Sequence, residues 1–78
     1  MLKVQTPHHA TKPLETVTVP AAGPGRFSVR DGQGREYANL PSDSEARVSV
    51  GGSLGHHQVF HLDADGRILD QATFLVDC

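Results

Sequence analysis

The sequence has few of the residues that several large protein classes require. Its 78 residues include one cysteine (Cys78), no tryptophan, one tyrosine and three phenylalanines. A single cysteine cannot form an intrachain disulfide, so the redox state of the native compartment does not follow from the cysteine count. Seven lysines and arginines stand singly along the chain against nine aspartates and glutamates. This charge pattern offers no basic patch for phosphates, and nucleic acid is not an expected partner.

Long apolar runs are also missing. One of the longest is Phe74-Leu75-Val76, whereas a membrane-spanning helix needs roughly 18 apolar residues in succession. The first residues lack the hydrophobic region of a signal peptide. We therefore expect no membrane partner, and the chain as written is expected in the cytoplasm, with the native compartment left open.

The composition that remains is that of one small domain. Hydrophobic residues make up 37% of the chain and charged residues 21%, in a mass of 8.4 kDa. A chain of this size buries about 60% of its unfolded surface, which is marginal for a domain without metal or disulfide. We expect one shallow core.

Short segments rich in β-branched residues alternate with turn signals. Residues 1–13 have prolines and histidines without apolar periodicity, which predicts a flexible N-terminal leader ahead of a domain over 14–78. The strands are expected at 14–19, 26–30, 35–40, 47–50, 56–62 and 67–76.

The connections indicate hairpins rather than helices. Asp31-Gly32-Gln33-Gly34 and Asp63-Ala64-Asp65-Gly66 each end in a glycine that can adopt a positive φ, as tight hairpin turns need. Ser42 and Glu45 have the spacing of a capping box, but the strand that follows leaves room for one helical turn at most. A turn is the preferred interpretation of residues 41–45.

Six to seven short antiparallel strands without a helix predict an all-β fold, a small β-sandwich, ahead of a small barrel. The side chains that alternation sends inward form the expected core: Val17, Val19, Phe27, Val29, Leu40, Val48, Val50, Val59, Ile68, Phe74 and Val76. Because this core is small, Phe74→Ala is expected to unfold the domain.

The segment from Val48 to Val76 resembles the closing hairpin of bacterial immunoglobulin-like modules. The matching residues are Gly55, Val59, Asp63, Gly66, Phe74 and Val76, while His57 stands where such modules often have a tyrosine. Residues 25–37 are similar to the small β domains that precede catalytic domains in bacterial glycoside hydrolases. The resemblance implies a small immunoglobulin-like β-sandwich that serves as a non-catalytic structural or docking domain and precedes a larger, carbohydrate-active enzyme domain. Its implied partner is that following domain of a larger parent chain, and it assigns no catalytic residue to this one.

Five histidines invite a metal hypothesis, above all His57 and His61. On a helix their spacing suits zinc, but on a strand they lie about 13 Å apart, too far to share one ion. Asp63 to Ile68 imitates the middle of a calcium-binding EF-hand loop, yet His61 and Ala72 fall at the positions that need carboxylates. We therefore predict no metal and no cofactor, and interpret the adjacent His8 and His9 as part of the leader.

One catalytic motif occurs literally. Gly51-Gly52-Ser53-Leu54-Gly55 has the letters of the nucleophile elbow of α/β-hydrolases. That elbow requires a strand that turns into a helix within a large sheet, which a helix-free chain of this length cannot build. We predict no catalytic residue, no small-molecule substrate and no enzymatic activity.

The predicted interaction patch is formed by Phe60 and Leu62. If Val59 faces the core, His57 and His61 do so too, and Phe60 and Leu62 lie on the outer face, exposed for docking. The opposite register stays open, because histidine prefers water to a small core. Two alternatives to the structural module also remain: a small ligand- or carbohydrate-binding module, which the shortage of aromatic rings disfavours, and a small β protein that self-associates through an edge strand.

Overall fold

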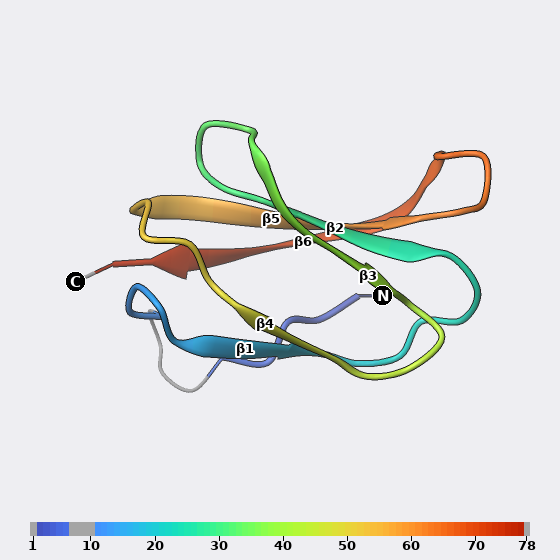
Figure 1. The fold of residues 1–78 in the computed structure, drawn as a ribbon, viewed down its shortest axis with the longest axis horizontal. Helices are drawn as coiled ribbons and strands as arrows, with labels where there is room; N and C mark the ends of the chain where they lie inside the picture. The colour runs from blue at the N-terminus through green and yellow to red at the C-terminus, as the bar shows by residue number, and fades with distance from the viewer. Residues whose placement is uncertain (1, 7–10, 78) are drawn as a thin grey trace.

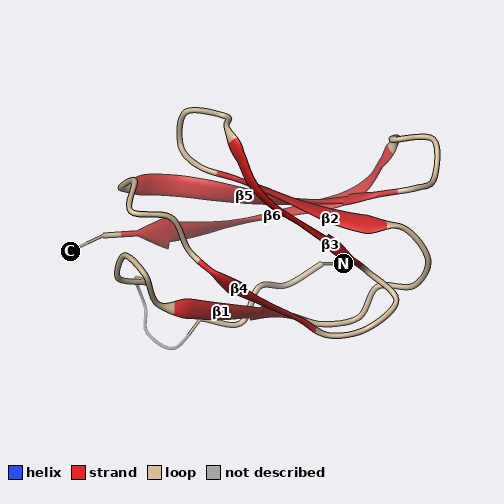
Figure 2. Ribbon diagram, viewed as in Figure 1, coloured by secondary structure: helices blue, strands red, loops and turns tan. Residues whose placement is uncertain are grey.

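Two antiparallel sheets, packed face to face, make up the fold in a computed structural model that describes residues 2–6 and 11–77 (Figure 1). The smaller sheet pairs β1 (Thr16–Val19) with β4 (Ala46–Ser49). The larger sheet has the order β3 (Glu36–Pro41), β2 (Arg26–Arg30), β5 (Gly55–Leu62), β6 (Ile68–Val76). Strands and loops account for every described residue (Figure 2), so the prediction of an all-β sandwich is confirmed.

The strands begin and end within two residues of the predicted positions. The largest difference is at β1, which begins at Thr16 rather than Leu14. Leu14 has a φ of +68° and is 77% exposed, so it belongs to a turn. Pro41 is the last residue of β3, and residues 42–45 connect it to β4 without a helix, as predicted. Ser42 is buried, and its hydroxyl donates to the carbonyl oxygen of Gly23 at 2.8 Å instead of capping a helix.

The two predicted hairpins have the same turn. Oδ1 of Asp31 accepts hydrogen bonds from the amides of Gln33 and Arg35 at 2.9 and 3.0 Å. Oδ1 of Asp63 accepts the equivalent bonds from Asp65 and Arg67 at 2.9 and 2.8 Å. In each turn the fourth residue is a glycine with a φ near +82° (82° at 34, 83° at 66), a conformation that suits glycine best. The sequence Asp-x-x-Gly-Arg therefore specifies both turns.

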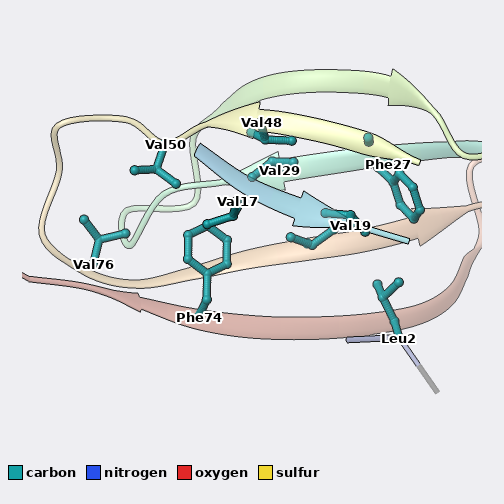
Figure 3. Close-up of a cluster of buried hydrophobic side chains, with 11 residues drawn as sticks. Leu2, Val17, Val19, Phe27, Val29, Val48, Val50, Phe74 and Val76 are labelled. Atoms are coloured by element: carbon teal, nitrogen blue, oxygen red, sulfur yellow. The ribbon is translucent and has the colours of Figure 1, made fainter. Parts of the chain in front are cut away.

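The core lies between the two sheets (Figure 3). Most of the predicted core residues are buried there, joined by two that were not predicted, Leu2 and Ala46. Leu40 packs against this core but is only partly buried. Ile68 is 59% exposed, so its assignment to the core is wrong. A bulge between His61 and Leu62 shifts the pairing of β5 with β6, and strict alternation from Phe74 back to Ile68 fails across it.

The predicted leader over residues 1–13 includes described residues that pack against both sheets. Leu2 is buried in the core, and its amide donates to Oδ2 of Asp70 at 2.7 Å. Gln5 pairs antiparallel with Thr18 of β1, and Thr11, fully buried, pairs parallel with Val76 of β6. The segment joins both sheets because each has an edge strand, β1 or β6, that can accept a further partner. Residues 7–10, with His8 and His9, and Cys78 lie outside the described residues.

None of the described residues forms a helix of the length and apolar character needed to cross a membrane.

Candidate functional site

Strand β5 carries most of the residues that the sequence singled out, and the structure fixes which way they face. Val59 belongs to the core cluster, and His57 and His61, two residues to either side, are buried on the same face. Phe60 lies on the opposite, outer face of the four-stranded sheet. The register with Val59 inward is therefore the one adopted.

Phe60 is nevertheless not exposed. Its side chain is 8% exposed, and the guanidinium carbon of Arg30 lies 5.0 Å from the ring centroid, in cation–π geometry. Ser28, the partner of Phe60 on β2, is small and fully buried, which lets the ring lie low on the sheet. The prediction of an exposed Phe60 is therefore wrong, because a long cationic side chain from the neighbouring strand covers it. Leu62 is half-buried.

His57 is the centre of a buried polar cluster. It is completely buried, and its Nε2 lies 2.7 Å from the carbonyl oxygen of Ser53, an atom that can only accept. Nε2 therefore carries the proton. Nδ1 lies 2.9 Å from the hydroxyl of Tyr37, and in a neutral ring it accepts the hydrogen bond that this hydroxyl donates. The geometry assigns the neutral Nε2–H tautomer.

Tyr37 completes the cluster from strand β3. Burial raises the pKa of its hydroxyl to about 12; a hydrogen bond from the Gly51 amide opposes that rise, and the negative charge of Asp31 adds to it. The ring of His57 lies between two others: its centroid is 5.5 Å from that of Tyr37 and 5.5 Å from that of Phe74. The sole tyrosine thus joins β3 to β5 and to the connection before β5.

His61 occupies the other end of the same face. Its Nε2 lies 3.1 Å from the carbonyl oxygen of Pro24, to which it donates, and its ring packs against Phe27 with centroids 5.7 Å apart. Beside it is an open groove of about 520 Å³, lined by Leu2, Leu69 and Asp70 among others. Hydrogen bonds from the amides of Gln71 and Leu2 hold the pKa of Asp70 below its usual value.

The structure does not bring His57 and His61 together as metal ligands. Each ring bonds to a different part of the backbone, Ser53 for His57 and Pro24 for His61. Across residues 2–6 and 11–77, no three histidine, cysteine, aspartate or glutamate side chains are grouped closely enough to hold a metal ion. Asp63 accepts hydrogen bonds from its own turn, as the hairpin interpretation of the EF-hand-like stretch predicted.

The elbow-like motif adopts a different structure from that of a hydrolase. Gly55 begins β5 with a φ of +111°, so a strand and not a helix follows Ser53. His57 contacts the main-chain oxygen of Ser53 in the bond described above. The serine contributes its carbonyl to the buried cluster.

Sequence reasoning missed the pairing of Tyr37 with His57. The resemblance placed His57 where immunoglobulin-like modules often have a tyrosine, and this was the available signal, because a corner residue of that kind bonds back to the preceding loop. His57 makes such a bond, four residues back to Ser53, and then uses its second nitrogen for Tyr37.

The sequence matches no protein-family model and is not significantly similar to any curated protein.

Proposed function

We propose that this chain is a non-catalytic, immunoglobulin-like module that serves as a structural or docking domain preceding a larger, carbohydrate-active enzyme domain. The observation that carries the proposal is the order in which the strands pair. In immunoglobulin sandwiches strands B and E pair in one sheet, and C, F and G pair in the other.

The pairing in this chain follows the same order. β1 and β4 take the places of B and E, and β2, β5 and β6 take those of C, F and G. β3 lies beside β2, where the variable type of the fold has an additional strand next to C. Gln5, paired with Thr18 of β1, takes the place of the first strand. This agreement supports an immunoglobulin-like module.

The aromatic rings are not placed for sugar binding. Phe27 and Phe74 are in the core, Phe60 is covered by Arg30, and Tyr37 is half-buried and bonded to His57. A sugar platform needs ring faces open to solvent. The structural role is therefore favoured over a carbohydrate-binding one.

Because Phe60 is buried, the docking surface in this proposal consists of apolar residues near the end of β5 and the start of β6. Leu62 is half-buried, its strand partner Ile68 is 59% exposed, and Leu69 is 56% exposed. We name Leu62, Ile68 and Leu69 the apolar end patch. Val76 is eight residues along β6 from Ile68, about 26 Å at the rise of a strand. A domain that follows the chain must fold back along β6 to cover this patch.

The coding sequence after Cys78 provides the first test. A long open reading frame that encodes a catalytic domain agrees with the proposal, whereas a stop codon at that point contradicts it. In the parent protein, Leu69→Asp should then weaken the coupling between the two domains, seen as separate thermal transitions in place of one. Leu54→Asp is the matched control, since Leu54 is 52% exposed but lies at the opposite end of β5.

The absence of catalysis is tested separately. Assays of the chain with chromogenic glycosides and esters should show no turnover above buffer. Turnover that Ser53→Ala abolishes would overturn the proposal of a non-catalytic module.

A further inference from the structure

The side chains of Tyr37 and His57 hold the connection between β4 and β5. It spans residues 50–54, and Val50 at its start is fixed in the core and by a hydrogen bond from its amide to Glu15 at 2.9 Å. The rest, residues 51–54, contains two glycines, and Leu54 is 52% exposed. We call these four residues the glycine loop.

The glycine loop is anchored at two points, at Gly51 by Tyr37 and at Ser53 by His57. The amide of Gly51 bonds to the Tyr37 hydroxyl, and the tyrosine ring lies 3.8 Å from where a Cβ of Gly51 would be. The carbonyl of Ser53 accepts the hydrogen bond from Nε2 of His57 at 2.7 Å. The relay runs from the Gly51 amide through the tyrosine hydroxyl and the imidazole to the Ser53 carbonyl.

This relay works with a neutral imidazole only. A second proton, on Nδ1, turns that nitrogen into a donor facing the Tyr37 oxygen. The tyrosine oxygen would then accept from both Nδ1 and Gly51, and its own hydrogen would have no acceptor in the relay. The added positive charge lies on the completely buried ring of His57, where it is much less favourable than in water.

The groups around His57 offer one compensating charge. The turn after β2 brings the Asp31 carboxylate close enough for its charge to interact with His57, from a position at the edge of the cluster. β3 contributes Tyr37, β6 contributes the uncharged ring of Phe74, and the facing sheet contributes valines, with Arg47 of β4 exposed to solvent. The nearest way to hydrate a protonated His57 is to move the glycine loop away.

We propose that His57 is a pH-sensitive latch: protonation of its ring releases the glycine loop and exposes the aromatic cluster of Tyr37, His57 and Phe74. The closed form binds one proton fewer than the open form, so acidification favours the open form. The latch is independent of the proposed docking function, because it lies at the other end of β5 from the apolar end patch.

Nuclear magnetic resonance of ¹⁵N-labelled protein tests the latch. At about pH 7.5 the ring of His57 should show a protonated Nε2 and an unprotonated Nδ1. On titration to about pH 5, the protection factor of the Gly51 amide, corrected for intrinsic exchange, should fall about tenfold or more in step with protonation of His57. Amides in the middle of β2 should keep their protection.

Two variants separate a latch from general acid unfolding. His57→Gln can still donate to Ser53 and accept from Tyr37 but cannot titrate, so its loop protection should not depend on pH. Tyr37→Phe removes the hydroxyl, and its loop should already be less protected at neutral pH. The matched control His56→Gln changes the exposed neighbour and should behave as the wild type.

The proposal is overturned if His57 has its proton on Nδ1 at neutral pH, if the loop opens with the same pH dependence in His57→Gln, or if His57 titrates with no change in loop protection. If His57→Gln does not fold, the tautomer and the Tyr37→Phe titration still decide.

Discussion

Asp31 shows how one carboxylate can specify a turn. Its Oδ1 accepts two backbone hydrogen bonds, and the amide of Arg35, followed by that of Gln33, lowers the pKa of the carboxyl group. Protonation weakens these bonds, since a charged acceptor forms stronger hydrogen bonds than a neutral one.

We predict that this carboxylate makes the fold sensitive to acid. A lowered pKa in the folded state means that the stabilisation is present above the unfolded value near pH 4 and is lost as the pH falls through the folded value. Urea denaturation from about pH 6 to about pH 2 should show a smaller loss of unfolding free energy for Asp31→Asn than for the wild type. An equal loss in both proteins would show that the turn carboxylate does not contribute.

His57 is a residue whose place could be only half predicted. Alternation along β5 gave the face on which it lies, conditional on Val59 facing inward, and the structure confirms that face. Its partners could not be predicted, because Tyr37 is twenty residues away and meets it only when β3, β2 and β5 form one sheet. The same holds for Phe60, whose covering side chain, Arg30, comes from a different strand.

At the scale of elements, local sequence patterns predicted where the strands lie better than they predicted how the strands contact one another. Turn residues and β-branched runs located all six strands, since both signals act within a few residues. The burial of Leu2 depends on segments far apart in the sequence and leaves no local signal. The bulge beside Leu62 lies next to the turn of the β5–β6 hairpin, between strands that are neighbours in the sequence. The exposure of Ile68 follows from that bulge.

Gly25 immediately precedes β2, and we expect it to tolerate substitution less than the other residues of the connections between strands. Its φ is +124°, and a Cβ there would clash with the backbone oxygen of Leu62, which a side-chain movement cannot relieve. Gly25→Ala should therefore lower the unfolding free energy by more than about 1 kcal/mol, measured by urea denaturation.

Gly52→Ala is the matched control. Gly52 has no positive φ, and a Cβ there meets nothing within 4 Å. Its unfolding free energy should change by less than about 1 kcal/mol in either direction. Similar effects at the two positions would contradict the close approach between Gly25 and β5.

At the scale of the whole molecule, the core is small enough for one side chain to decide stability. Phe74 is 6% exposed and packs between the sheets with Val17 and Val76 (Figure 3). Phe74→Ala should cost about 3–5 kcal/mol, comparable with the total stability of a small domain.

Differential scanning calorimetry should accordingly show no cooperative transition for Phe74→Ala. Leu69→Ala serves as the control, since Leu69 is 56% exposed, and it should shift the unfolding free energy by no more than about 0.5 kcal/mol. A native-like transition in the phenylalanine variant would mean that the core is assigned wrongly.

The repeated Asp-x-x-Gly-Arg turn also bears on the order in which the chain folds. Each turn closes a hairpin between neighbouring segments, β2 with β3 and β5 with β6, whereas β1 and β4 pair across everything between Thr16 and Ser49. Loop-closure entropy grows with the length of chain enclosed, and isolated hairpins form in about 1–10 μs. The two hairpins can thus form first and dock through β2 and β5, while the β1–β4 pair closes later. Until it does, one face of the four-stranded sheet, with Phe27, Val29 and Val59, stays open to water and to other unfolded chains.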